Sequence, residues 1–81
     1  MAVTYYVALP FIETPDGPAA GQAQECQSEY VAVRAAELLA RKPEFVGALA
    51  FKRSGEPAVG DFAPAEIIKT FGNVPDDLSE L

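Results

Sequence analysis

The chain has 81 residues, of which 49% are hydrophobic and 22% charged, and its net charge is −6. That length allows one domain, and the hydrophobic fraction is too high for a disordered chain. The acidic balance argues against nucleic-acid binding, which needs clustered lysine and arginine. No apolar run approaches the roughly 20 residues of a membrane-spanning helix. We therefore expect neither nucleic acid nor membrane among the partners.

The composition also restricts the chemistry of a site. The chain has no histidine, the commonest general base and metal ligand, and Cys26 is its single cysteine. No set of residues has zinc-ligand spacing, so we predict no metal and no cofactor. The first residues lack the basic start and cleavage site of a secretory signal, and an unpaired cysteine suits a reducing compartment. Both features favour a cytoplasmic protein.

The first quarter of the chain predicts a hairpin. Residues 3–12 are rich in β-branched and aromatic types and indicate a strand, with Pro10 at a rim or bulge. Thr14-Pro15-Asp16-Gly17 is typical of a chain reversal. Residues 20–26 then return as a weak edge strand.

A helix is predicted from Glu29 to Lys42. Ser28 offers an N-cap oxygen, Pro43 ends the pattern, and Glu37 and Arg41 form a favourable pair four residues apart. The helical spacing gives a predicted apolar stripe of Val31, Ala32, Ala35, Leu38 and Leu39.

The second half of the chain repeats the order of strand, turn, short strand and helix, at 45–53, 54–57, 58–62 and 64–72. For the second helix, Pro64 suits the first helical position and Gly72 suits the residue after the end. We therefore predict an α+β domain over residues 1–72 with a ββαββα order. Its mostly antiparallel sheet carries both helices on one face, and residues 73–81 form an acidic tail.

The alternation of side chains along the two long strands separates a face of large residues from a face of small ones. We expect the large side chains to pack under the helices, which leaves the small face open. An open sheet face normally carries polar residues, and this one carries few, so it is predicted to bind a partner. Alternatively, the face is bare. The residues predicted to bind are Thr4, Tyr6, Ala8, Val46, Ala48 and Ala50.

No catalytic residue is predicted. Cys26 precedes a helix N-terminus, which lowers a thiol pKa, but Glu25 and Glu29 oppose a thiolate and no histidine can act as its base. We interpret Cys26 as an inert small side chain, with thiol chemistry as the minor alternative. The acidic residues Asp76, Asp77 and Glu80 lack the spacing of a calcium loop.

Several stretches resemble a family of short bacterial proteins of about 80 residues whose function is unknown. The stretches are YYVALPF, ECQS followed by RAAELLAR, and GALAFKRSGEPAVGDFAPAEIIKTFGNVP. The resemblance spans nearly the whole chain and implies a small stand-alone bacterial protein. It implies no activity and no site residues.

These observations favour a small non-catalytic interaction protein that associates through the helix-free sheet face. Its partner is a second copy, forming a homodimer, or another protein. The alternative is a module that binds a small molecule in a cleft at the sheet face or between subunits, near Tyr6 or beside Lys52 and Arg53.

Overall fold

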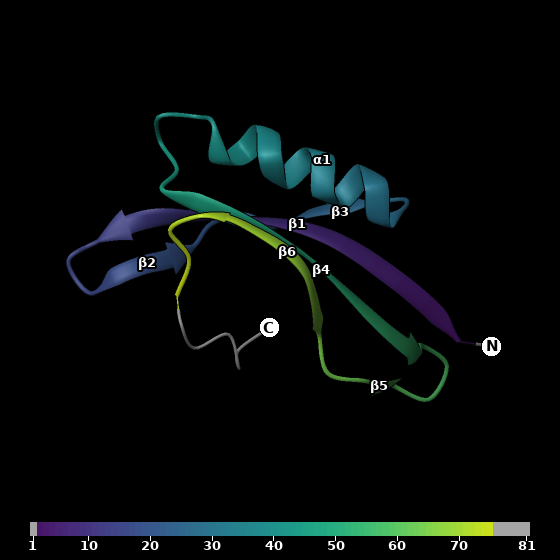
Figure 1. The fold of residues 1–81 in the computed structure, drawn as a ribbon. Coiled ribbons are helices and arrows are strands. Elements are labelled where there is room, and N and C mark those ends of the chain that lie inside the picture. The colour runs from purple at the N-terminus through teal and green to yellow at the C-terminus, as the bar shows by residue number, and fades with distance from the viewer. Residues whose placement is uncertain (1, 76–81) are drawn as a thin grey trace.

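A computed structural model describes residues 2–75, which form a six-stranded antiparallel sheet with one helix across it (Figure 1). The elements are β1 (Val3–Thr14), β2 (Gly17–Ala20), β3 (Gln24–Cys26), α1 (Glu29–Ala40), β4 (Gly47–Glu56), β5 (Asp61–Phe62) and β6 (Glu66–Gly72). Within this range the chain is mostly β with a single helix. The predicted ββαββα arrangement with two helices on one face is therefore wrong.

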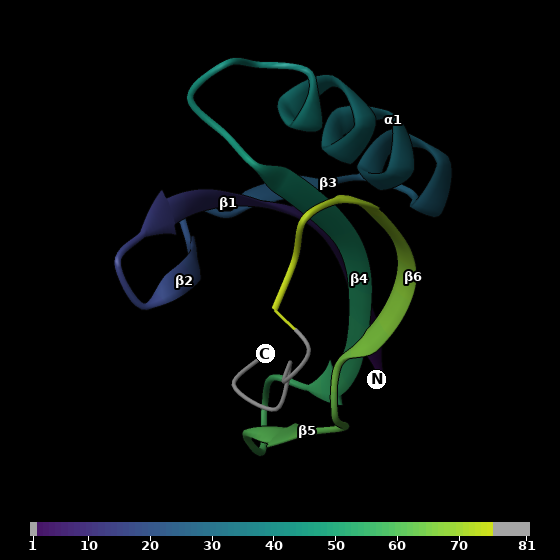
Figure 2. The same ribbon diagram turned by 60° about the vertical axis from the view of Figure 1, so that its left-hand side comes forward.

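The sheet is built around the long antiparallel ladder between β1 and β4, which runs from the pair Val3–Gly55 to the pair Phe11–Gly47. On the outer side of β1 lie β2 and β3, and on the outer side of β4 lie β5 and β6. Figure 2 shows that the sheet curls into a half-barrel, with β2 and β6 at opposite rims and α1 on the convex side. The curl defines a convex face under the helix and a concave face without one.

Pro10 lies in the middle of β1, opposite Ala48, and is fully buried. A proline in a central strand removes one donor from the ladder. On this side of β1 the pairing with β3 stops at Ala8 and the pairing with β2 begins at Phe11, so Pro10 faces the gap between them. Its carbonyl oxygen accepts a hydrogen bond of 2.8 Å from the Gly21 amide, which holds the connecting segment against the gap.

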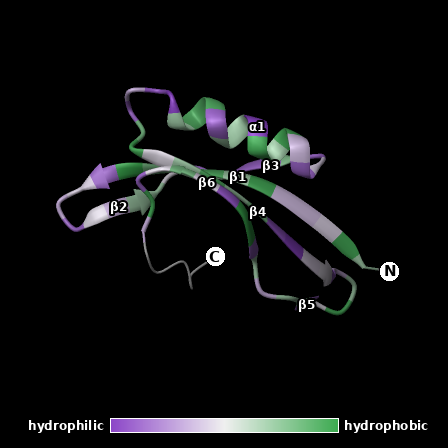
Figure 3. Ribbon diagram, viewed as in Figure 1, coloured by the Kyte–Doolittle hydropathy of each residue, from purple (hydrophilic) through white to green (hydrophobic). Residues whose placement is uncertain are grey.

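The helix begins as the sequence predicts. The Ser28 hydroxyl accepts a hydrogen bond of 3.2 Å from the Val31 amide, and this satisfies one of the free donors of the first turn. Hydrophobic and hydrophilic bands alternate along the helix (Figure 3). Its buried side is centred on Ala32 and Ala36, whereas Val31 and Leu38 of the predicted stripe are 44% and 48% exposed. The predicted stripe is therefore displaced around the helix axis.

Small side chains seat the helix on the sheet. Ala32 and Ala36 pack with Ala8, Ala48 and Ala50, and all five are fully buried. Helices approach their neighbours at a distance set by the side chains at the contact, so alanine on both sides allows close packing. The prediction that large side chains lie under the helix is wrong, because the helix covers the small face.

The large side chains of the two central strands form a second cluster on the concave face. Leu9, Phe11 and Leu49 are buried there, and Val46 and Val74 pack against them. Val74 belongs to the predicted acidic tail, so at least the start of that segment is part of the fold. The acidic residues of the predicted tail, Asp76, Asp77 and Glu80, lie outside the described residues.

The predicted second helix at 64–72 is instead strand β6, which pairs with β4 along most of its length. Its consecutive Ile67 and Ile68, with Thr70 and Phe71, are residue types that favour strands, and a helix of two turns gains little stability by itself. Gly72 does adopt a positive φ of 69°, but it ends a strand rather than a helix.

Candidate interaction surface

The concave face carries large apolar side chains that remain partly open to solvent. Alternate residues of a strand point to the same face of the sheet. The odd-numbered residues of β1 and β4 therefore lie on the concave face with the buried Leu9 and Leu49. Cross-strand pairing adds residues of β5 and β6, since Phe62 is paired with Gly55 and Ile67 with Phe51. The open apolar residues of this face are Val3, Tyr5, Val7, Phe51, Phe62 and Ile67. We call this set the concave apolar patch.

An aromatic contact organises one end of the patch. The rings of Tyr5 and Phe62 have centroids 6.1 Å apart with planes tilted by 41°, a favourable geometry for aromatic pairs. The Phe62 ring lies over Gly55, where any Cβ would overlap it. The ring therefore covers backbone that a glycine leaves bare, yet Phe62 itself stays 44% exposed.

The predicted partner-binding residues do not form one surface. Ala8, Ala48 and Ala50 are fully buried beneath α1, and Tyr6 packs beside them. Val46 packs on the opposite face, against the cluster of Leu9 and its neighbours. Thr4 is exposed near the start of β1, where its hydroxyl lies 3.0 Å from that of Ser54. The alanines at these positions allow α1 to pack closely on the sheet, so they mark the covered face and not the open one.

The basic residues at the end of β4 point to opposite faces. Lys52 lies on the helix side, with its Nζ atom 3.5 Å from a Glu66 carboxylate oxygen and 3.8 Å from that of Glu29. It connects three elements, the first turn of α1 and strands β4 and β6. Arg53 is paired with Tyr5 and shares the concave face with it. A small molecule bound beside both Lys52 and Arg53, as the sequence predicts, would have to reach both faces of the sheet, so the two residues do not form one site.

Cys26 is buried at the end of β3, and its thiol donates a hydrogen bond of 3.6 Å to the Gln24 carbonyl. Burial raises the pKa of the thiol, the nearby Glu25 raises it further, and a backbone hydrogen bond with Ala8 partly offsets both. A raised pKa disfavours the nucleophilic thiolate. This geometry gives no support to thiol chemistry at Cys26.

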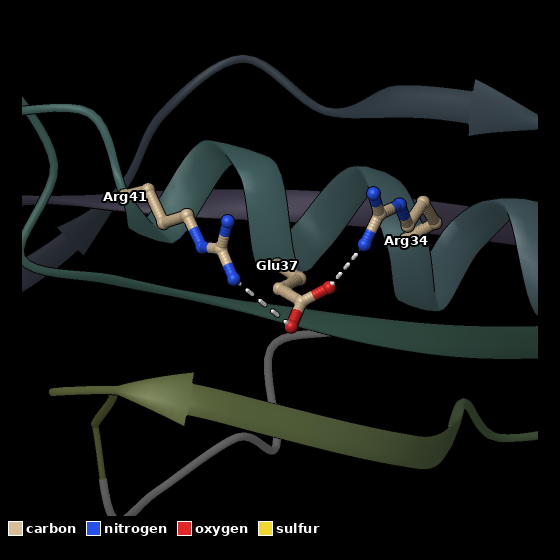
Figure 4. Close-up of polar contacts among 3 residues, drawn as sticks. All are labelled: Arg34, Glu37 and Arg41. Atoms are coloured by element: carbon tan, nitrogen blue, oxygen red, sulfur yellow. Dashed lines mark hydrogen bonds and ion pairs between the residues drawn. The ribbon is translucent and has the colours of Figure 1, made fainter.

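The exposed side of α1 combines apolar residues with a small charge cluster. Tyr30, Val31 and Leu38 are 77%, 44% and 48% exposed. Between them, Glu37 pairs with Arg34 at 2.9 Å and with Arg41 at 3.5 Å (Figure 4). The predicted pair of Glu37 and Arg41 is thus confirmed, with a second arginine added. Exposed pairs of this kind fix side-chain positions but contribute little stability.

Two open hollows border the fold. One of about 480 Å³ lies at the β4–β5 end and is lined by residues including Ser54, Asp61 and Phe62. The other, of about 320 Å³, lies near the end of α1 and includes Gln24 and Lys42. Among residues 2–75, no three metal-ligating side chains come together, and α1 is too short to cross a bilayer, with no other candidate span in that range.

Comparison with models of protein families, with curated proteins and with solved structures gives no match for this chain. The resemblance to short bacterial proteins therefore stays a prediction.

Proposed function

We propose that this chain is a small cytoplasmic interaction protein without a catalytic role, which associates with a second copy of itself through the concave face. The observation that carries the proposal is the concave apolar patch. Val3, Phe62 and Ile67 are 39%, 44% and 37% exposed. They lie on three strands that are joined through β4 by the pairs Val3–Gly55, Gly55–Phe62 and Phe51–Ile67. Contiguous exposed apolar area of this kind is typical of interaction sites rather than of bare surface.

Charge supports a second copy as the occupant. Each chain carries a net charge of −6, so two copies repel each other wherever acidic side chains meet. On the concave face, the stretch of β1 from Val3 to Phe11 and that of β4 from Leu49 to Arg53 contribute no carboxylate. Association through these two stretches therefore brings no two carboxylates together.

The proposal is tested by the oligomeric state of the purified chain, measured by native mass spectrometry and light scattering over a range of concentrations. We expect a homodimer. Val3→Glu places a carboxylate on the patch and should shift the chain to monomer with an unchanged circular dichroism spectrum. Val59→Glu is the matched control, since Val59 is 75% exposed in the β4–β5 turn.

Two results would overturn the proposal. A native chain that stays monomeric at about 100 µM, well above the micromolar dissociation constants of ordinary specific complexes, removes self-association altogether. A dimer that Val3→Glu leaves intact removes the concave face as its interface.

Binding of a small molecule is the second candidate, favoured by the hollow of about 480 Å³ beside Phe62. That volume is within the range of ligand pockets, and its aromatic wall adjoins the polar Ser54 and Asp61. Nuclear magnetic resonance titration with a mixture of common metabolites tests it. Shifts confined to the amides of Ser54 and Phe62 would support binding, and unchanged spectra across the mixture would reject it.

A further inference from the structure

Among the described residues 2–75, the outer edge of β6 has no neighbouring strand. This strand pairs with β4 on one side, and no residue between 2 and 75 pairs with its other side. Figure 2 shows β6 as one rim of the half-barrel, opposite β2. An open strand edge presents a row of unpaired amides and carbonyls, which is a template for another strand.

The pairing with β4 determines which backbone groups of β6 face outward. The Asn73 amide donates to the Val46 carbonyl at 2.9 Å, just beyond the end of the ladder. In an antiparallel ladder, residues alternate between pairs that exchange hydrogen bonds and pairs that do not. Counting back from Asn73, Phe71 and Lys69 direct their backbone groups toward β4, whereas Thr70 directs its amide and carbonyl outward.

The two rims differ in how they are protected. The β2 rim is four residues long and contains Pro18, a residue that blocks strand addition. β6 is seven residues long and contains no proline. Its two charged side chains are already engaged within the chain, Glu66 with Lys52 at 3.5 Å and Lys69 over the ring of Phe71 at 5.3 Å. Of these two rims, β6 therefore offers the longer edge without proline, and its stretch from Lys69 to Gly72 lies beyond the register shift.

We propose that two copies join by antiparallel pairing of their β6 strands about a two-fold axis at Thr70. A two-fold axis normal to a sheet places one residue opposite itself. Thr70 is the residue whose outward amide and carbonyl can form a hydrogen-bonded pair on that axis. Lys69 and Phe71 direct their backbone groups to β4, and Ile68 lies at the register shift opposite Ala50 and Phe51. At the axis, the Thr70 amide of each copy donates to the Thr70 carbonyl of the other.

This register also suits the side chains. With Thr70 opposite itself, Lys69 of one copy lies opposite Phe71 of the other, on the helix side of the sheet. The ammonium of Lys69 already contacts the face of an aromatic ring within its own chain, and the pairing offers it a second one. A register centred on Lys69 would instead bring two ammonium groups together, which destabilises a cross-strand pair.

This pairing of two β6 strands, which we call the β6 joint, specifies how the two copies associate and rests on the proposed function. A two-fold axis normal to the sheet maps each face onto itself, so both helices lie on the outer side. Both concave faces then turn toward one interior, and the two half-barrels continue a single curled sheet. The partly exposed Val3, Phe51 and Ile67 of each copy would line that shared interior.

Thr70→Pro tests the joint. It removes the amide that faces outward and leaves the hydrogen bonds to β4 in place, since proline is tolerated on an edge strand in that orientation. We expect the variant to be monomeric with the circular dichroism spectrum of the native chain, and its melting transition should lose the concentration dependence that a dimer shows. Thr70→Val, which keeps the amide and the strand preference, is the matched control and should remain dimeric.

A covalent variant tests the same joint without depending on the stability of the proline variant. In a pair centred on residue 70, the two Cα atoms lie about 5.5 Å apart, within disulfide range, so Thr70→Cys should form a disulfide-linked dimer under mild oxidation. Glu66→Cys is the control, because the two copies of residue 66 would lie about 26 Å apart at about 3.3 Å per residue. The native Cys26 is buried and should not compete.

The outcomes separate this inference from the proposed function. A native chain that is monomeric overturns both. A native dimer that Val3→Glu dissociates, but that Thr70→Pro leaves intact and Thr70→Cys does not cross-link, overturns the β6 joint alone. Equal cross-linking of Thr70→Cys and Glu66→Cys would show collision rather than a defined register and would also overturn the joint.

Discussion

A Cβ atom at Gly72 would lie 2.8 Å from the carbonyl oxygen of Val46. Gly72 also has a positive φ of 69°, which costs a residue with a side chain about 1–2 kcal/mol. Gly72→Ala should therefore combine backbone strain with a displacement of β4, and we expect a loss of about 2–4 kcal/mol in the free energy of unfolding.

Gly60 separates these two effects. It has the same φ of 69° but would have nothing within 4 Å of an added Cβ. Gly60→Ala should cost the backbone strain alone, about 1–2 kcal/mol. Denaturant unfolding of both variants gives the comparison. Equal losses would show that the close approach of Gly72 to Val46 has no energetic effect.

Ala48 provides a test of which face the helix covers. It is fully buried between β4 and α1, so Ala48→Glu would bury a carboxylate with no partner. We expect a loss on the order of 3–5 kcal/mol, which is a large part of the stability of a small domain. Circular dichroism should show the variant largely unfolded, whereas Val59→Glu at an exposed position stays folded. If Ala48→Glu stayed folded, residue 48 would lie on a face of the sheet that the helix does not cover.

Glu37 is predicted to contribute little despite its two arginine partners. The side chains of Arg34 and Arg41 are 57% and 68% exposed, so both ion pairs are screened by solvent. Glu37→Gln should lower the free energy of unfolding by less than about 1 kcal/mol. The difference from the native chain should vanish near 1 M salt, where the Debye length is about 3 Å. Glu44→Gln removes an exposed carboxylate outside this cluster, and a loss as large there would show a general charge effect.

The stability of the fold should depend on pH through Cys26. Its pKa is raised, chiefly by burial, so the folded state holds the thiol proton more tightly than the unfolded chain does. The resulting stabilisation is present below the ordinary thiol pKa of about 8.5 and is lost as pH rises through the raised value. Urea unfolding at pH 7 and pH 10 should show a steeper decline for the native chain than for Cys26→Ala. Parallel declines would show that the thiol does not titrate with unfolding.

The local signals in the sequence predicted the first chain reversal and the start of the helix, but not the arrangement of the sheet or the single helix. The reversal at Thr14–Gly17 and the cap at Ser28 are both confirmed, because each depends on residues adjacent in the chain. The prediction of a helix at 64–72 was wrong because Pro64 and Gly72 are as compatible with the ends of a strand as with the ends of a helix. The choice between them was made by β4, whose free edge bonds β6.

The face of the sheet could not be assigned from the strands alone. Alternation correctly separated Leu9 and Leu49 from Ala8 and Ala48. Which set meets the helix depends on the distance at which the helix packs, and the small residues Ala32 and Ala36 of the helix decide it. The candidate surface was consequently predicted on the wrong side of the sheet, although the apolar character that indicated a surface exists on the other.

The β1–β4 ladder has a kinetic consequence. It pairs Val3 with Gly55 and Phe11 with Gly47, so the centre of the sheet joins the two halves of the chain. Helix α1 and the first hairpin can form from neighbouring residues, but neither is buried until that long loop closes. Proteins dominated by such distant pairings fold in milliseconds to seconds, far more slowly than helical bundles of similar size. During that interval the apolar side chains of the two central strands, Leu9 and Leu49 among them, are exposed in every newly synthesised copy.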